Sequence, residues 1–124
     1  MEKKQNDNCL CGTGGYIVMA CSGASDVGQI SDLVARKLRD NGVRKMNCLA
    51  VVGAGIKKSI EDLKTKELLV IDGCSIDCGK RMMEKNNISN YKYLRVTDLG
   101  FVKGKTAITE DSIQKVYDIA EIIY

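Results

Sequence analysis

Short apolar runs alternate along this chain with segments of helical periodicity, and this alternation constrains the fold more than any other feature. Strands are expected at residues 16–21, 45–52, 67–73 and 91–100. The continuous apolar run at 16–21 is typical of a strand that is covered on both faces, whereas 91–100 alternates, as in a strand nearer the sheet edge. Strands that alternate with helices predict a three-layer α/β domain with a mostly parallel four-stranded sheet, of the Rossmann-like or flavodoxin-like type.

The segments between the runs carry the expected helix signals. In the first of them, Ser25 or Asp26 can cap a helix that Gly42 can end. Its apolar residues recur at helical spacing: Val27, Ile30, Val34 and Leu38. Shorter helices are predicted at 57–66 and 78–87, and a last one starts near Thr109.

Connections between parallel strands are right-handed, so the loops that follow the strands all lie at one edge of the sheet. Doubly wound proteins bind their ligands at that edge. The expected strand order is 2-1-3-4, which places Cys21 and Cys74 on neighbouring strands. We therefore expect the functional residues at the carboxyl ends of the strands.

Composition narrows the classes of protein. A polar leader (residues 1–15) precedes a single domain (16–124), and no segment has the roughly 20 continuous apolar residues of a membrane span. The net charge of +3 comes from scattered lysines, so no nucleic-acid footprint is expected. No signal peptide is recognisable, which predicts a cytoplasmic protein. In that reducing compartment the six cysteines favour metal binding, catalysis or burial over disulfides.

Cysteines gather where the predicted strands end, and histidine is absent from the sequence. Cys21 and Cys74 end strands, Cys78 starts a helix, and Cys48 lies in or near the end of a strand, where simple burial is an equal alternative. Thiolates are donors that suit zinc. Cys78 lies where the first-turn N–H groups of a helix are unpaired, and Cys21 just precedes another helix start, so both positions are expected to lower the pKa of the thiol. A thiolate can bind a metal or attack an electrophile, so both roles stay open. Asp77 is expected to cap the helix that Cys78 begins.

Four ordered motifs carry a family resemblance. These are "CSGASDVGQISDLVARKL", "MNCLAVVGAGI", "VIDGCSIDCGKRMME" and "LRVTDLGFVKGK". Together they resemble the DGC-domain family, which is named for the triplet here formed by residues 72–74 and whose members are described as zinc-binding proteins. The match covers roughly residues 16–112. The resemblance implies a zinc site on Cys21, Cys48, Cys74 and Cys78. Cys9 and Cys11 lie outside the shared region.

Other functions compete with zinc binding. Cys21 or Cys78 can be the nucleophile or redox centre of a thiol enzyme, and four thiolates can also hold an iron–sulfur cluster. A fourth reading is a small-anion site near Ser22, Ser25, Lys103 and Lys105. The glycine loops "VVGAGIKK" and "GFVKGKT" are poor nucleotide motifs, because the first lacks its third glycine and the second is one residue short of a phosphate-binding loop.

Overall fold

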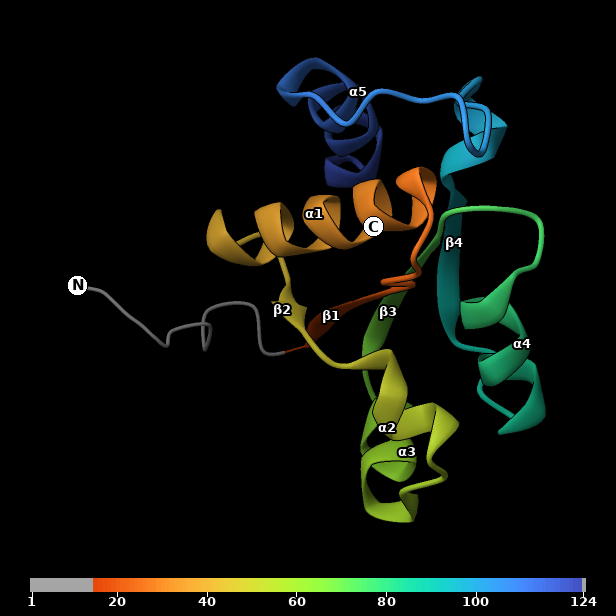
Figure 1. Cartoon of the computed structure of the whole chain (residues 1–124). Helices are drawn as coiled ribbons and strands as arrows, with labels where there is room; N and C mark the ends of the chain where they lie inside the picture. The colour runs from red at the N-terminus through yellow and green to blue at the C-terminus, as the bar shows by residue number, and fades with distance from the viewer. Residues whose placement is uncertain (1–14, 124) are drawn as a thin grey trace.

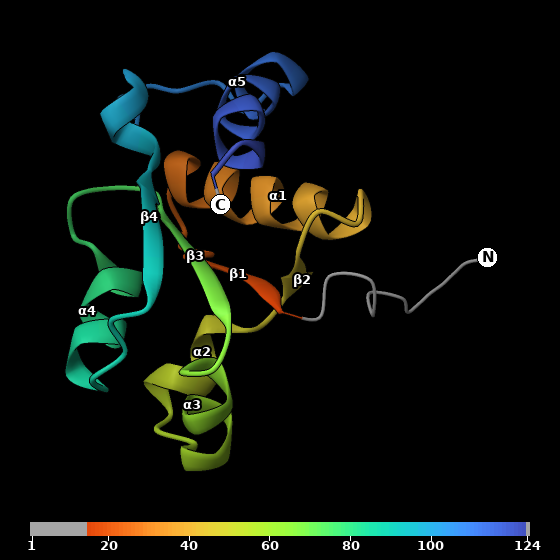
Figure 2. The ribbon, with the colours of Figure 1, turned by 180° about the vertical axis from the view of Figure 1, so that it is seen from behind.

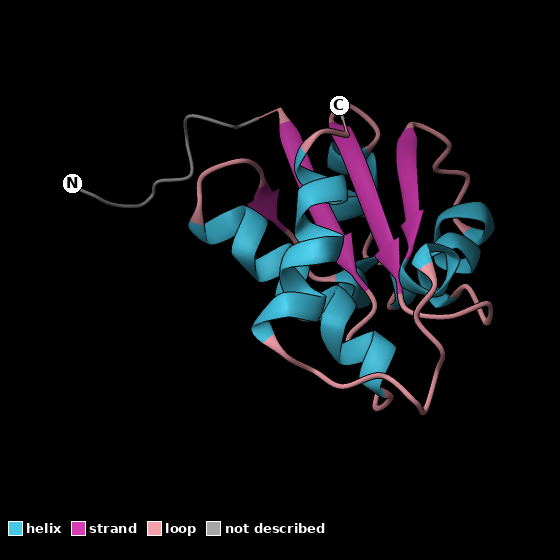
Figure 3. Ribbon diagram, turned by 90° about the horizontal axis from the view of Figure 1, so that it is seen from above, coloured by secondary structure: helices cyan, strands magenta, loops and turns pink. Residues whose placement is uncertain are grey.

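The structure, a computed structural model, describes residues 15–123. At its centre lies a parallel sheet of four strands in the order β2-β1-β3-β4 (Figure 3). The strands are β1 (Tyr16–Ala20), β2 (Lys45–Met46), β3 (Glu67–Asp72) and β4 (Tyr91–Arg95). The predicted sheet and strand order are both confirmed. The predicted leader, with Cys9 and Cys11, lies outside the described residues except for Gly15.

The two central strands carry the fold. They pair in register from Tyr16 opposite Glu67 to Ala20 opposite Ile71. The last five residues of β3 and the last four of β1 are all buried. Burial on both faces explains why these segments read as continuous apolar runs rather than as alternating ones.

Helices cover both faces of the sheet (Figures 1 and 2). On one face lie α1 (Asp26–Asp40) and α5 (Glu110–Glu121), and on the other lie α2 (Leu49–Gly53), α3 (Lys57–Leu63) and α4 (Cys78–Lys85). Successive residues of β3 point to opposite faces, so Leu69 joins the core beneath α1 and α5, while Val70 joins the other core. Two separate cores on one sheet make the three layers that were predicted.

The strand predicted at residues 45–52 is wrong in its second half. The last hydrogen bond to the sheet runs from the amide of Asn47 to the carbonyl of Val18, at 3.0 Å. Beyond it the chain leaves the sheet and forms α2. Within α2, Leu49 and Val52 are both buried at a spacing of three residues, which turns them to one helix face. Cys48 is therefore the exposed residue that precedes a helix, and the alternative of a cysteine buried in a strand is overturned.

The strand predicted at 91–100 is also shorter than expected. It ends at Arg95, and a 3₁₀ turn, η2 (Val96–Leu99), follows. Val96 is fully buried in the core beneath α1 and α5, so this turn keeps an apolar contact while it redirects the chain. The alternating pattern at 91–100 predicted a single strand, but its second half takes a different backbone conformation.

Both long helices begin as their sequences indicate. Ser25 is the N-cap of α1, and its hydroxyl accepts the amide of Gly28 at 3.1 Å. Thr109 and Ser112 form a reciprocal capping box at the start of α5. Of the two residues proposed to cap α1, the structure selects Ser25, which leaves the Asp26 carboxylate available for another contact. Every helix among residues 15–123 is too short or too polar to cross a lipid bilayer.

Candidate functional site

The carboxyl edge of the sheet positions four free cysteines. The amide of Cys21 continues the ladder beyond β1 by donating to the carbonyl of Ile71 at 2.9 Å. Cys48 precedes α2, Cys74 lies two residues after β3, and Cys78 is the first residue of α4. Cys21 and Cys74 are half-buried, whereas the other two are exposed.

Three of these cysteines line one cavity. Cys21, Cys48 and Cys78 reach it from three separate segments of the chain, and its volume is about 580 Å³. Cys74 is not among its lining residues. It packs instead against the core beneath α1 and α5, and Nζ of Lys103 lies 3.4 Å from its Sγ. The structure therefore groups three of the predicted ligands and places the fourth beside a lysine.

The thiols are suitable donors for zinc, but they do not form a finished coordination shell. Within the described part of the chain, no group of three or more histidine, cysteine, aspartate or glutamate side chains is gathered closely enough to hold a metal ion. Three thiols around one cavity nevertheless supply the soft donors that a thiophilic metal needs. The four-cysteine ligand set stays a prediction.

The electrostatic environment of Cys21 differs from the one that its place before a helix predicted. Burial raises the pKa of Cys21 above its ordinary value, although a hydrogen bond from the amide of Gly23 partly offsets that effect. The negative charge of Asp72 and that of a Cys78 thiolate raise this pKa further. The prediction of a lowered pKa at Cys21 is wrong, because burial outweighs the amides.

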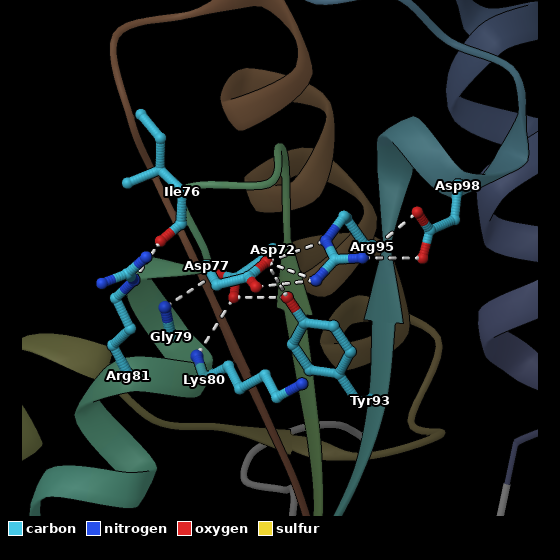
Figure 4. Close-up of polar contacts among 9 residues, drawn as sticks. All are labelled: Asp72, Ile76, Asp77, Gly79, Lys80, Arg81, Tyr93, Arg95 and Asp98. Atoms are coloured by element: carbon cyan, nitrogen blue, oxygen red, sulfur yellow. Dashed lines mark hydrogen bonds and ion pairs between the residues drawn. The ribbon is translucent and has the colours of Figure 1, made fainter.

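Asp72, the first residue of the triplet at 72–74, accepts hydrogen bonds from the helix amides that were expected to lower the pKa of Cys78. Its buried carboxylate accepts the amide of Gly79 at 2.8 Å and the amide of Lys80 at 3.1 Å, both in the first turn of α4 (Figure 4). The hydroxyl of Tyr93 donates to the same carboxylate at 2.7 Å. The unpaired amides proposed at the start of α4 are therefore paired, and the triplet's aspartate fixes the helix that carries Cys78.

Asp77 does not cap α4 through its side chain, contrary to expectation. It adopts a left-handed backbone conformation with φ of 59°. Its carboxylate pairs with the guanidinium of Arg95, with Nε and Nη2 donating at 2.8 and 2.7 Å (Figure 4). Burial alone would raise the pKa of Asp77, but Arg95 and the hydroxyl of Tyr93 outweigh it and lower the pKa. This ion pair ties the segment between Cys74 and Cys78 to β4.

Asp26 holds the basic loop, the segment between η2 and α5 that carries Lys103 and Lys105. Its two carboxylate oxygens accept the amides of Gly104 and Thr106, each at 2.9 Å. These two hydrogen bonds lower the pKa of Asp26. The same loop carries Lys103 to Cys74. Asp26 thus has a role in holding a loop, which capping propensity alone did not indicate.

The partners of the proposed anion-binding residues are now defined. Ser25 caps α1, and the hydroxyl of Ser22 donates to Asp32 at 3.2 Å. Lys103 contacts the thiol of Cys74. Lys105 is exposed in the same loop. An anion at these four residues stays a prediction.

Replacing Asp26 by asparagine should loosen the basic loop, because an amide side chain cannot accept on both of its polar atoms. We expect faster hydrogen exchange at the amides of Gly104 and Thr106. In the unaltered protein the same loosening should occur as pH falls through the depressed pKa of Asp26, since a lowered carboxyl pKa stabilises the native state above it. Asp40→Asn, on an exposed residue that pairs with Arg39, is the control and should leave both amides protected.

The fold and the site together define a class: a parallel α/β domain with free thiols gathered at the carboxyl edge of its sheet. The chain belongs to the DGC-domain family, whose model matches residues 17–120. It is 27% identical over 88 residues to the anaerobic and virulence modulator AnvM of Pseudomonas aeruginosa. That alignment covers 70% of this chain and 67% of AnvM. No solved structure matches the chain.

Sequence reasoning missed part of the cavity. Arg36 and Arg39, on successive turns of α1, line it together with the three thiols. Their spacing of three residues places them on one helix face, which was the available signal. The contacts of Tyr93 and Arg95 with the triplet segment also went unpredicted, because they join residues that are distant in the sequence.

Proposed function

We propose that this domain binds a thiophilic metal ion, with Zn²⁺ favoured, through Cys21, Cys48 and Cys78. The observation that supports this most directly is that three thiols from three separate chain segments line one cavity. With no histidine in the sequence, thiolates are the anionic soft donors that the chain can offer. Membership of the DGC-domain family supports metal binding as the general role.

Three thiolates define an open site rather than a closed one. Structural zinc sites use four protein ligands, whereas sites with three keep a position for water or another molecule. Cys74 packs against the core beneath α1 and α5, beside Lys103. Whether Cys74 also binds the metal therefore distinguishes a closed site from an open one. A bound zinc ion with an open position supplies a Lewis acid or an exchangeable binding site.

The roles of this chain's own residues follow from their contacts. Asp72 holds the first turn of α4 and thereby positions Cys78. Gly23 lies close to Cys21, and a Cβ on that glycine would lie 3.3 Å from the sulfur. Burial keeps Cys21 protonated at neutral pH, so metal binding there must release a proton. We therefore expect metal affinity to rise with pH.

Single serine substitutions test the ligand set in anaerobically purified, reduced protein. Each of Cys21→Ser, Cys48→Ser and Cys78→Ser should lower the affinity for Zn²⁺ by about 100-fold or more, because each removes one thiolate of the donor set. Cys74→Ser should stay within about threefold of the unaltered protein, as expected for a residue outside the shell. Affinity is measured by competition with a chelator dye, and cobalt substitution reports thiolate ligation by its absorbance.

The control is a double variant, Cys9→Ser with Cys11→Ser, which removes the two cysteines that lie outside the described residues. It should bind one Zn²⁺ as tightly as the unaltered protein. Metal retained in all three cavity variants would contradict the proposal. Loss of metal in Cys74→Ser to the same extent as in the others would replace the open site by a closed four-cysteine site.

A thiol-based redox function is the second candidate, and it is favoured because Cys21 and Cys78 line the same cavity. The raised pKa of Cys21 argues against a nucleophile that is a thiolate at rest. Metal-free protein in which one thiol is alkylated far faster than the others would support this function. Visible absorbance after anaerobic purification would indicate an iron–sulfur cluster on the same thiols.

A further inference from the structure

The thiol cavity is much larger than a metal ion needs. Its volume of about 580 Å³ lies within the range of roughly 300–1,000 Å³ that small-molecule sites occupy. A water molecule accounts for only about 30 Å³, so a metal ion with one bound water would leave most of this space for another occupant.

The cavity wall combines two chemically distinct kinds of polar residue. Cys21, Cys48 and Cys78 line it, and so do Arg36 and Arg39. Met46, Leu49 and Met82 add apolar residues to the same wall. A molecule that matched this wall would carry both a soft donor and negative charge.

The arginines retain donors for such a ligand. Asp32 accepts from Nε of Arg36 at 2.8 Å, and among residues 15–123 no further partner engages the Nη groups of Arg36. Asp40 pairs with Nε and Nη2 of Arg39, so Nη1 stays available within the same part of the chain. Guanidinium groups recognise carboxylates through pairs of parallel hydrogen bonds. Because Asp32 also lines the cavity, the two arginines leave one net positive charge on its wall before any thiol ionises.

We propose that the cavity binds a small anionic thiol, with carboxylates against Arg36 and Arg39 and sulfur toward the cysteine thiols. The sulfur contact rests on the proposed function, because a metal held by three thiolates has a position open to a fourth sulfur donor. The carboxylate contact depends only on the arginines. The ligand class is therefore a low-molecular-weight thiol that carries one or more carboxylates, bound together with the metal.

The probe is mercaptosuccinate, titrated calorimetrically into the zinc-loaded and the metal-free protein. Succinate, which lacks the thiol, and 2-mercaptoethanol, which lacks the carboxylates, separate the contribution of the thiol from that of the carboxylates. We expect mercaptosuccinate to bind the zinc-loaded protein more tightly than either. The double variant Arg36→Gln with Arg39→Gln should weaken its binding by about tenfold or more, since two charge-assisted contacts are lost. Zinc affinity should change little.

The control is Lys92→Gln with Lys115→Gln, which removes two positive charges from exposed residues that do not line the cavity. It should bind mercaptosuccinate as the unaltered protein does. A protein that binds zinc but not mercaptosuccinate, that loses its zinc to this ligand, or that binds it equally well without the arginines overturns the inference and leaves the metal proposal intact. A protein that binds no zinc refutes the metal proposal. Arginine-dependent binding of mercaptosuccinate to that protein would still support the anion contact, and its absence would overturn it.

Discussion

Replacing Gly73 by alanine should destabilise the domain by about 2–3 kcal/mol, the usual cost of forcing an extra methyl group into a packed interior. A Cβ on Gly73 would lie 2.7 Å from the amide nitrogen of Gly28 and 2.8 Å from the carbonyl carbon of Val27. These are backbone atoms in the first turn of α1, so no side-chain rotation can relieve the contact. Either α1 or the end of β3 must move.

Urea unfolding measures this loss, and Gly15→Ala provides a matched control. A Cβ on Gly15 meets no atom within 4 Å, and its backbone is not left-handed. The control should therefore change the free energy of unfolding by less than about 0.5 kcal/mol, as for other exposed substitutions. A Gly73→Ala protein as stable as Gly15→Ala would show that α1 does not pack on the triplet glycine.

This contact gives the triplet a physical explanation. The glycine lets α1 approach the end of β3, and α1 carries Arg36 and Arg39 toward the thiol cavity. Two residues beyond β3, Cys74 then lies beside the core that α1 covers. Displacing α1 should therefore alter the cavity as well as the stability, and we expect zinc affinity to fall in Gly73→Ala but not in Gly15→Ala.

The overall fold could be predicted because it depends on strong, regular signals. Continuous burial makes residues 17–20 of β1 and 68–71 of β3 apolar, and right-handed connections then leave few possible strand orders. The strand predicted at 45–52 was wrong in its second half because burial alone does not define the backbone conformation. Leu49 and Val52 are buried, but apolar residues in a short run do not distinguish a strand from a helix that is buried on one face.

The position of the cysteines near the carboxyl edge of the sheet was predictable, but the geometry around them was not. Cys21 follows a strand whose direction is fixed, and it does line the cavity. The direction of Cys74 depends on a loop that contains the left-handed Asp77, and that conformation is held by Arg95 on a different strand. A conformation stabilised by a partner 18 residues away has no local signature in the sequence. The same holds for Tyr93, which binds both carboxylates of this segment.

Replacing Asp72 by asparagine should have two separable effects. The first is a lower free energy of unfolding. Asp72 is 1% exposed, and its carboxylate accepts hydrogen bonds from Gly79, Lys80 and Tyr93. An asparagine side chain keeps the shape but turns one acceptor into a donor, so at least one buried donor loses its partner. Because an unpaired buried donor costs about 1–3 kcal/mol, and the lost hydrogen bonds were to a charged group, we expect destabilisation of about 2–3 kcal/mol.

The second effect is a more acidic Cys21. The negative charge of Asp72 is one of the causes that raise the pKa of this thiol, after burial, so removing the charge should lower the pKa. At a fixed pH near neutrality, the thiolate fraction and the alkylation rate of Cys21 should then increase. The measurement is the pH dependence of alkylation by iodoacetamide, followed by mass spectrometry of the peptide that contains Cys21.

Asp98→Asn separates this local effect from a general change in net charge. Asp98 carries the same charge and pairs with the same Arg95, but its side chain is 58% exposed and makes no contact with α4 among the hydrogen bonds of the described residues. It should leave both the free energy of unfolding and the alkylation profile of Cys21 nearly unchanged. If Asp72→Asn destabilised the protein and left the pKa of Cys21 unaltered, the triplet aspartate would only hold α4 in place. A lowered pKa would show that its negative charge also contributes to the raised pKa of the buried thiol.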